Sequence, residues 1–167
     1  LVIDNIRQLE ETYKSIKGSA VNRSPKTLEE ALTSQESFYY WNRAKFNELE
    51  DKTSLLASSL FLFLNKTCFR GVYREGPNGF NVPFGHYKNP GILDEEHILQ
   101  VSKLIEPVIF YHMDFKESLE MVDEGDFMYL DPPYAPENEK SFVSYTKAGF
   151  SLEDHQTLFM RCKDSKA

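Results

Sequence analysis

The spacing of apolar residues predicts helices over most of residues 1–64. Between residues 1 and 17, apolar side chains recur at helical intervals, at Ile3, Ile6, Leu9, Tyr13 and Ile16. The sequence also predicts a helix start at 24–30, where a proline precedes two glutamates, and a longer helix over 35–49. Residues 52–64 become continuously apolar towards their end, which favours a buried helix.

The pattern becomes β-prone after residue 64. Two segments, 65–74 and 80–88, flank the turn formers Gly76-Pro77-Asn78-Gly79, an order that is typical of a β-hairpin. Basic and aromatic residues interleave along both arms. Because the major groove of DNA admits a two-stranded ribbon, this composition indicates a DNA-binding surface. Alternatively, the aromatic residues only pack the hairpin onto the preceding helices.

The second half of the chain alternates between helical and strand-like patterns. We expect a helix over 93–105, a buried strand over 108–111, a short helix over 116–122 and a second buried strand over 127–130. A strand, a helix and a strand in this order form a parallel α/β unit. A polar loop over 135–149 and a final helix then follow, with Ser151 as its N-cap and Asp154 as the acid of a capping box.

The tetrapeptide Asp131-Pro132-Pro133-Tyr134 directly follows the second predicted strand. Two prolines have fixed φ and no N–H, so the chain must leave the sheet in a stiff, extended turn. This places Asp131 at the carboxyl end of a strand, where open α/β sheets hold their ligands. A carboxylate and a free carbonyl there can accept both N–H groups of an exocyclic amine on a base, which frees the nitrogen lone pair for methylation. The alternative is a surface turn without a ligand.

Composition limits the class of protein. The 167 residues can form one sizeable core, and no apolar run approaches the roughly 20 residues that span a membrane. Cys68 and Cys162 have no Cys or His partner at metal-binding spacing, so we expect reduced thiols in a cytoplasmic protein, and no metal site.

Charge is distributed unevenly along the chain, whose net charge is −7. Residues 13–28 contain four basic residues and no acid, and residues 65–90 contain four basic residues and one acid. Residues 91–139, by contrast, contain 13 acids and two lysines. This asymmetry indicates that one face of the protein binds a polyanion, although the basic stretches alone would also fit a solvated surface.

Two motifs together resemble the Dam-type (D12-class) DNA N6-adenine methyltransferases. The first is the D-P-P-Y tetrapeptide. The second is the block L-N-[KR]-x-x-[FY]-x-G-x-x-R followed by F-N-V-P-F-G-x-Y-K-x-P, which is matched from Leu64 to Pro90 with its spacing intact. The resemblance implies an α/β fold: a partial Rossmann-like S-adenosylmethionine-dependent methyltransferase domain with a helical plus β-hairpin target-recognition domain. It also implies that the substrate is double-stranded DNA, usually at GATC.

The resemblance assigns roles along the hairpin. Phe69 is implied to wedge into the duplex, with Arg70 near the orphaned base. Arg74 is implied to read a guanine, and Val72 and Pro83 to meet a thymine methyl. The full set of predicted DNA-binding residues is Lys66, Phe69, Arg70, Val72, Arg74, Asn81, Pro83, His86, Tyr87 and Lys88. His86 departs from the family, where many relatives have Arg, and this leaves the outer bases of the target less defined.

The helix over 35–49 carries a further family pattern, Y-Y-x-x-R-x-x-F-N, from Tyr39 to Asn47. We interpret its aromatic residues as helix-packing core.

The catalytic and cofactor roles follow the same resemblance. Asp131 and the carbonyl of Pro132 would orient the adenine N6 amine, Pro133 would stiffen the turn, and Tyr134 would stack on the base. Asp114 and Phe115 resemble the family's D-F pair, which holds the adenine of S-adenosylmethionine together with the corner at Asp131. Asp114 can instead cap the following helix.

The glycine-rich turn of the family, F-x-G-x-G, is not found in these 167 residues. We therefore expect an internal fragment that is inactive or nearly so by itself, with a target-recognition region over 1–92 and a partial catalytic domain over 93–167. The expected protein is a monomer or weak dimer without a membrane segment. A cytosine N4 methyltransferase of the same class and a non-catalytic DNA-binding module remain alternatives.

Overall fold

The computed structural model describes residues 1–133 and 150–165, in two compact units. The first unit comprises Leu1–Pro107 and the second Val108–Ala167. The units are defined by compactness and not by function, so the functional boundary expected after residue 92 stays a prediction.

The first unit is mainly helical, and capping residues set where its helices begin. Side-chain oxygens of Thr27, Ser34, Ser54 and Asp94 accept the backbone N–H three residues further on, which satisfies a donor left free in the first turn. The helix expected to start near Ser24 therefore begins later, after Thr27. The helices are α1 (Val2–Ser15), α2 (Leu28–Ala31), α3 (Gln35–Glu48), α4 (Leu55–Thr67) and α5 (Glu95–Leu104).

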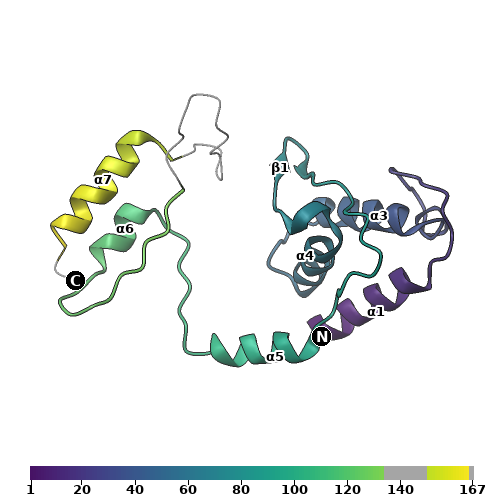
Figure 1. The fold of residues 1–167 in the computed structure, drawn as a ribbon, viewed down its shortest axis with the longest axis horizontal. Coiled ribbons are helices and arrows are strands. Elements are labelled where there is room, and N and C mark those ends of the chain that lie inside the picture. The colour runs from purple at the N-terminus through teal and green to yellow at the C-terminus, as the bar shows by residue number, and fades with distance from the viewer. Residues whose placement is uncertain (134–149, 166–167) are drawn as a thin grey trace. The chain divides into compact units, whose positions relative to one another are not determined.

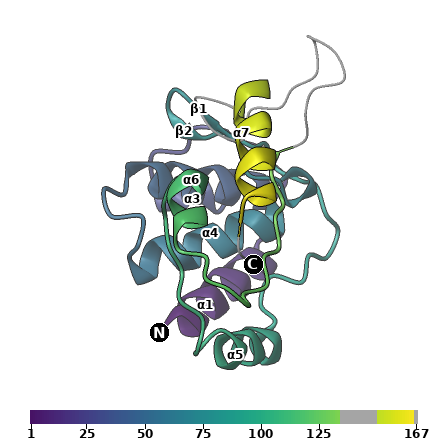
Figure 2. The same ribbon diagram turned by 90° about the vertical axis from the view of Figure 1, so that its left-hand side faces the viewer.

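The core of the first unit forms where α4 packs against both α1 and α3 (Figure 1; Figure 2). Phe63 of α4 is fully buried, and its ring meets Tyr13 of α1 and Phe38 of α3 edge-on at centroid distances of 5.9 and 5.7 Å. Burying side chains of this size contributes about 1.5–3 kcal/mol each. The predicted apolar face of α1 is confirmed, since Ile6, Tyr13 and Ile16 are all buried.

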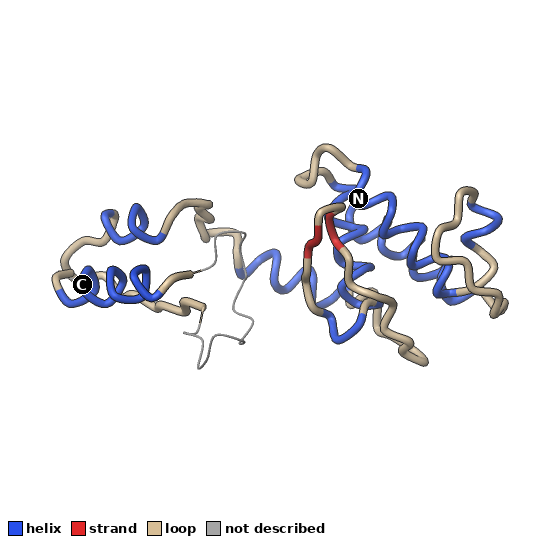
Figure 3. Tube along the Cα trace, turned by 90° about the horizontal axis from the view of Figure 1, so that it is seen from above, coloured by secondary structure: helices blue, strands red, loops and turns tan. Residues whose placement is uncertain are grey.

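A short hairpin follows α4 and confirms the predicted β-hairpin, with shorter strands than expected (Figure 3). Its strands β1 (Glu75–Gly76) and β2 (Gly79–Phe80) pair antiparallel, with Glu75 opposite Phe80 and Gly76 opposite Gly79. The 3-10 turn η1 (Phe69–Gly71) precedes it, and an isolated bridge joins Cys68 to Phe84. We call residues 69–88 the ribbon.

The second unit contains two packed helices, α6 (Phe115–Glu120) and α7 (Leu152–Lys163). Arg161 joins them, because its Nη1 contacts Glu120 Oε1 at 3.0 Å and donates to the Lys116 carbonyl at 3.1 Å. The predicted capping box is confirmed: the Ser151 hydroxyl accepts from Asp154 N, and the Asp154 carboxylate accepts from Ser151 N.

The two predicted strands of this unit are absent from the described structure. Residues 108–111 and 127–130 form no strand and have no ladder partners among the described residues, and Ile109, Phe110 and Phe127 are 73%, 73% and 92% exposed. A buried parallel strand needs paired neighbours and cover on both faces. The described residues supply neither, so the expected parallel α/β unit is not found within them and stays a prediction.

Candidate nucleic-acid interface and catalytic corner

All ten residues predicted to bind DNA lie in the first unit, and all ten are exposed. Neither Arg70 nor Arg74 is buried against the helices. The hairpin therefore presents these side chains to solvent, while Phe80, Val82 and Phe84 are buried and attach it to the core.

The turn that carries Phe69 and Arg70 has an unusual backbone. Arg70 and Gly71 have positive φ angles of 57° and 62°, and a left-handed conformation costs a non-glycine residue roughly 1–2 kcal/mol. Two side chains hold this turn: the Tyr87 hydroxyl accepts from Arg70 N at 3.0 Å, and Asn65 Nδ2 donates to the Gly71 carbonyl at 2.7 Å. Tyr87 thus supports the turn that exposes the predicted wedge.

The predicted guanine reader, Arg74, is held by a neighbour on the opposite arm. Its Nε donates to Asn81 Oδ1 at 2.7 Å, and its carbonyl accepts from Asn81 N at 3.0 Å. Asn81 therefore orients the guanidinium in this structure.

Side chains of α3 form hydrogen bonds with backbone groups along the outer edge of the ribbon. Asn47 Nδ2 donates to the Phe80 carbonyl at 3.0 Å, and Asn47 Oδ1 accepts from Phe80 N at 2.9 Å. The Tyr39 hydroxyl and Arg43 Nη1 both donate to the Val82 carbonyl, at 2.8 and 3.1 Å. Burial raises the pKa of Tyr39, so its hydroxyl keeps the proton that it donates. The aromatic residues of this helix pack the core as expected, but the sequence interpretation missed the polar contacts of Arg43 and Asn47.

A basic hollow of about 210 Å³ opens on the same helix. Its lining includes Arg23, Lys26 and Arg43, and the Arg43 guanidinium lies 4.6 Å from the centroid of the Tyr40 ring. The charge pattern of residues 13–28 indicated a basic surface, but the contribution of α3 could not be read from it.

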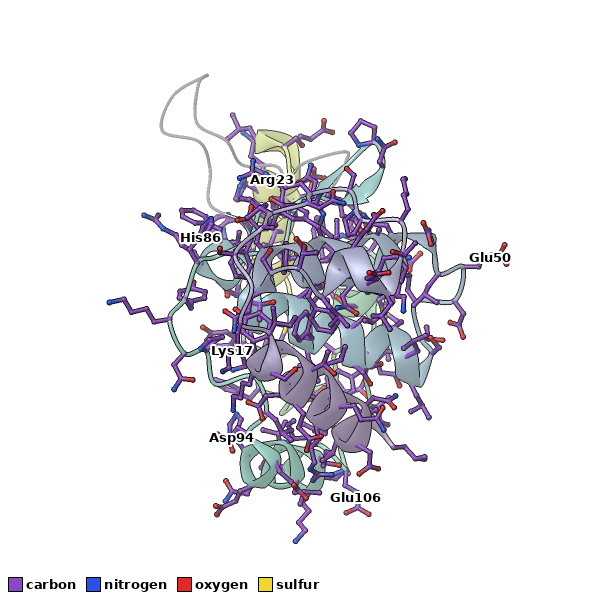
Figure 4. The ribbon with its side chains drawn as sticks, turned by 90° about the vertical axis from the view of Figure 1, so that its right-hand side faces the viewer. Lys17, Arg23, Glu50, His86, Asp94 and Glu106 are labelled. Atoms are coloured by element: carbon purple, nitrogen blue, oxygen red, sulfur yellow. The ribbon has the colours of Figure 1, made fainter. Side chains whose placement is uncertain are left out.

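A buried carboxylate lies beside this hollow. Glu36 Oε1 accepts from Arg23 Nε at 2.8 Å, and its Oε2 lies 3.9 Å from His86 Nε2. Figure 4 labels the two partners, Arg23 and His86. Arg23 and His86, which are distant in sequence, therefore meet at the start of α3, and the residue that departs from the family is held near Glu36.

The predicted catalytic corner is described only in part. Asp131 is exposed, Pro132 and Pro133 are half-buried, and Tyr134 lies outside the described residues. Asp131 does not line the basic hollow or the apolar hollow between Phe46, Phe61 and Tyr73. The loop expected over 135–149 also lies outside the described residues.

Asp114 caps α6, because its Oδ1 accepts from Lys116 N at 2.9 Å. The alternative role for this residue is therefore present in the structure. A carboxylate has lone pairs beyond the one used here, and the half-buried ring of Phe115 follows it, 5.2 Å from Phe150. Asp114 therefore keeps exposed acceptor capacity next to the Phe115 ring.

Among residues 1–133 and 150–165, no cluster of three or more His, Cys, Asp or Glu side chains is arranged to bind a metal ion. In the same part of the chain, no helix has the length and apolar character to cross a membrane.

Comparison with known proteins adds to this picture. The family model described as D12 class N6 adenine-specific DNA methyltransferase matches residues 1–166. The type II methyltransferase M.MjaIII of Methanocaldococcus jannaschii is 46% identical over 127 residues, which cover 74% of this chain and 44% of that protein. The retron Ec67 DNA adenine methylase of Escherichia coli is 32% identical over 162 residues, covering 95% of this chain and 54% of that protein. The chain thus spans about half the length of the curated relatives it matches.

Proposed function

The chain belongs to the D12 class of N6 adenine-specific DNA methyltransferases. From this we propose that the enzyme that contains these residues methylates the N6 amine of adenine in duplex DNA, at GATC. S-adenosylmethionine is the proposed methyl donor. The observation that supports this most is the ribbon, because it exposes nine of the ten predicted DNA-contacting residues on a packed helical support, and the tenth, Lys66, is exposed at the end of α4. The Asp-Pro-Pro-Tyr sequence supplies the groups for the chemistry.

The proposed chemistry at the corner uses hydrogen-bond acceptors. The N6 lone pair of adenine is delocalised into the ring, so the amine is a poor nucleophile. Asp131 and the Pro132 carbonyl each accept one N–H, which localises the lone pair on nitrogen and aims it at the donor. Tyr134 stacks on the extruded base. When bound, S-adenosylmethionine supplies the electrophilic methyl group. The amine proton leaves through Asp131 to water.

The proposed DNA contacts extend from the ribbon to the basic hollow. Phe69 enters the base stack beside the target adenine, and Arg74 reads a guanine. Arg23, Lys26 and Arg43 contact backbone phosphates. The support for this is the guanidinium of Arg43, which borders the hollow and also bonds the ribbon at Val82. Phosphate contacts of this kind position a protein without reading sequence.

The exposed apolar segments support a Rossmann-like sheet in the complete enzyme. Residues 108–111 and 127–130 have the composition of buried strands but no partner among the described residues. We propose that both become parallel strands when the remainder of a methyltransferase sheet pairs with them. This pairing would place Asp131 at the carboxyl edge, facing the cofactor.

The base specificity can be tested in cells. The complete gene product that carries these residues is expressed in a host without adenine methylation, and the genomic DNA is digested to nucleosides. We expect N6-methyladenine, located at GATC by methylation-sensitive cleavage. Asp131→Ala at equal expression should reduce the product about 100-fold or more.

Other outcomes of the same experiment oppose the proposal. N4-methylcytosine would assign the cytosine-specific alternative. Absence of any methylated base would favour the non-catalytic DNA-binding alternative, and full methylation by Asp131→Ala would contradict the catalytic role of that carboxylate.

A further inference from the structure

We propose that Asn47 is a positioning residue for DNA sequence recognition. It belongs to a ridge of α3 side chains that takes the place of a third strand beside the ribbon. This ridge consists of Tyr39, Arg43 and Asn47. The inference rests on the proposed function, because it concerns how the ribbon holds its base-reading side chains. None of the three belongs to the residues assigned to base contacts above.

The carboxamide of Asn47 reproduces the bonding of a neighbouring peptide group. It donates to the Phe80 carbonyl at 3.0 Å and accepts from the Phe80 amide at 2.9 Å. In an antiparallel sheet, a residue of an adjacent strand makes this same pair of bonds. Asn47 therefore occupies the position of a strand residue at the outer edge of β2.

The spacing of the ridge matches the spacing of the strand. A helical step of four residues advances about 6 Å, and two residues of an extended strand advance about 6.7 Å. Asn47 meets Phe80, and Arg43, four residues earlier, meets Val82, two residues later. A straight helix can thus satisfy alternate residues of an extended segment that runs in the opposite direction.

The ribbon needs this support because its own pairing is short. Each strand has two residues, and an isolated two-stranded hairpin is marginally stable in water. The ridge also covers an edge that would otherwise leave the Phe80 and Val82 backbone groups unpaired. Both residues are buried, so an unmade hydrogen bond there would be costly.

The contact between Asn47 and Phe80 is linked to the predicted base reader, Arg74, through one further residue. Phe80 faces α3, and the next residue, Asn81, faces the other arm, where its amide donates to the Arg74 carbonyl and its side chain holds Arg74 Nε. Successive residues of a strand alternate in this way, so a shift of Phe80 moves Asn81. Asn47 therefore fixes the orientation of Arg74 without touching it.

Gly79 supplies independent evidence for a close approach. Its φ is +88°, and a Cβ at this position would lie 2.8 Å from Asn47 Oδ1. Any side chain at residue 79 would therefore be strained and would displace the carboxamide. The turn is built around the contact between Asn47 and β2.

The test uses variants of the 167-residue chain and two readouts. Asn47→Ala removes both bonds to Phe80, and Asn47→Asp keeps only the acceptor. Gly79→Ala displaces the carboxamide without changing it. Asn42→Ala is the matched control, because buried Asn42 also lies in α3 but donates to Phe38 within the helix. The readouts are exchange of the Phe80 amide proton by NMR, and the ratio of the Kd for a duplex with its guanine changed to the Kd for a GATC duplex.

We expect Asn47→Ala and Gly79→Ala to reduce the Kd ratio about fivefold or more. We also expect Phe80 exchange to accelerate about tenfold. Asn47→Asp should fall between these variants and the wild type. Asn42→Ala should lower the melting temperature while changing neither readout, which separates positioning from general stability.

Two results would overturn the inference: unchanged Phe80 exchange in Asn47→Ala, or a loss of discrimination no greater than that of Asn42→Ala. A wild-type chain that does not distinguish the two duplexes would contradict the recognition function itself, and the positioning role with it. The wild-type measurement thus separates failure of the proposed function from failure of the inference alone.

Discussion

The two units of the chain differ in whether their apolar residues find partners. In the first unit, Tyr13, Tyr39 and Phe63 are at most 1% exposed, whereas Phe110 and Phe127 of the second are 73% and 92% exposed. The predicted DNA-contacting residues therefore stand on a packed support. The Asp-Pro-Pro-Tyr sequence instead follows a segment that the described residues leave uncovered. We infer from this contrast that the proposed recognition surface is built locally, whereas the proposed catalytic corner would depend on longer-range pairing.

The largest expected difference between the units comes from truncating one phenylalanine in each. Phe63→Ala should lower the free energy of unfolding by about 3–5 kcal/mol, because it leaves a cavity between α1, α3 and α4. Phe127→Ala should change it by less than about 0.5 kcal/mol. Urea unfolding followed by circular dichroism measures both, and equal losses would remove the contrast.

A smaller effect tests the polar contacts of the first unit. Tyr39→Phe should lower the free energy of unfolding by about 1 kcal/mol, because the hydroxyl donates to Val82. Tyr13→Phe is the matched control. The buried Tyr13 hydroxyl has no hydrogen-bond partner among the described residues, and burial raises its pKa to about 12. This second change should be neutral or stabilising, and a loss as large as that of Tyr39→Phe would contradict the described hydrogen bonding.

Removing a helix cap should destabilise its helix by about 1 kcal/mol. We expect the loss to appear in one measurement for α4 and in another for α7. Ser54→Ala removes the cap of α4, which lies in the core, so global unfolding should report the loss. Ser151→Ala removes the capping box of α7. We expect faster hydrogen exchange at the start of α7 with little change in the unfolding of the first unit. Equal shifts in global unfolding would show that the two units unfold together.

The smallest effect on stability should come from modifying a thiol in the second unit. Cys68 is fully buried, and burial raises the pKa of its thiol, so it should react slowly with iodoacetamide in the native state. Cys162 is partly exposed and should react first. Mass spectrometry of timed samples gives the order. Alkylated Cys162 should change the unfolding of the first unit by less than about 0.5 kcal/mol.

Local signals made much of the fold predictable. The Ser151 capping box, the apolar face of α1 and the turn at residues 76–79 each depend on neighbours in sequence, and each is found in the structure. The strand expected over residues 108–111 is not found in the described part of the chain, because an apolar run shows that a segment prefers burial, but not whether a pairing strand is present. Tertiary pairing decides the structure of such a segment.

In the candidate site, too, features set by sequence neighbours could be predicted and features set by tertiary contacts could not. The exposure of the predicted DNA-binding residues follows the basic and aromatic pattern of the hairpin. The roles of Asn47 and Asn81 could not be predicted, because a single polar residue on a helix or strand gives no sign of a backbone group placed opposite it in the fold. Asp114 was predicted with two alternatives, and the structure shows the helix cap.

Hydrogen exchange of the wild-type chain in the absence of DNA tests the central contrast most directly. We expect slow exchange at the amides of Phe69, Phe80 and Asn81, which donate to Pro83, Asn47 and Arg74. We expect fast exchange across residues 108–111 and 127–130. Fast exchange at the ribbon amides would contradict a recognition surface that is formed before DNA binds. Protection of both apolar segments would contradict a catalytic corner that is still unformed in the chain alone.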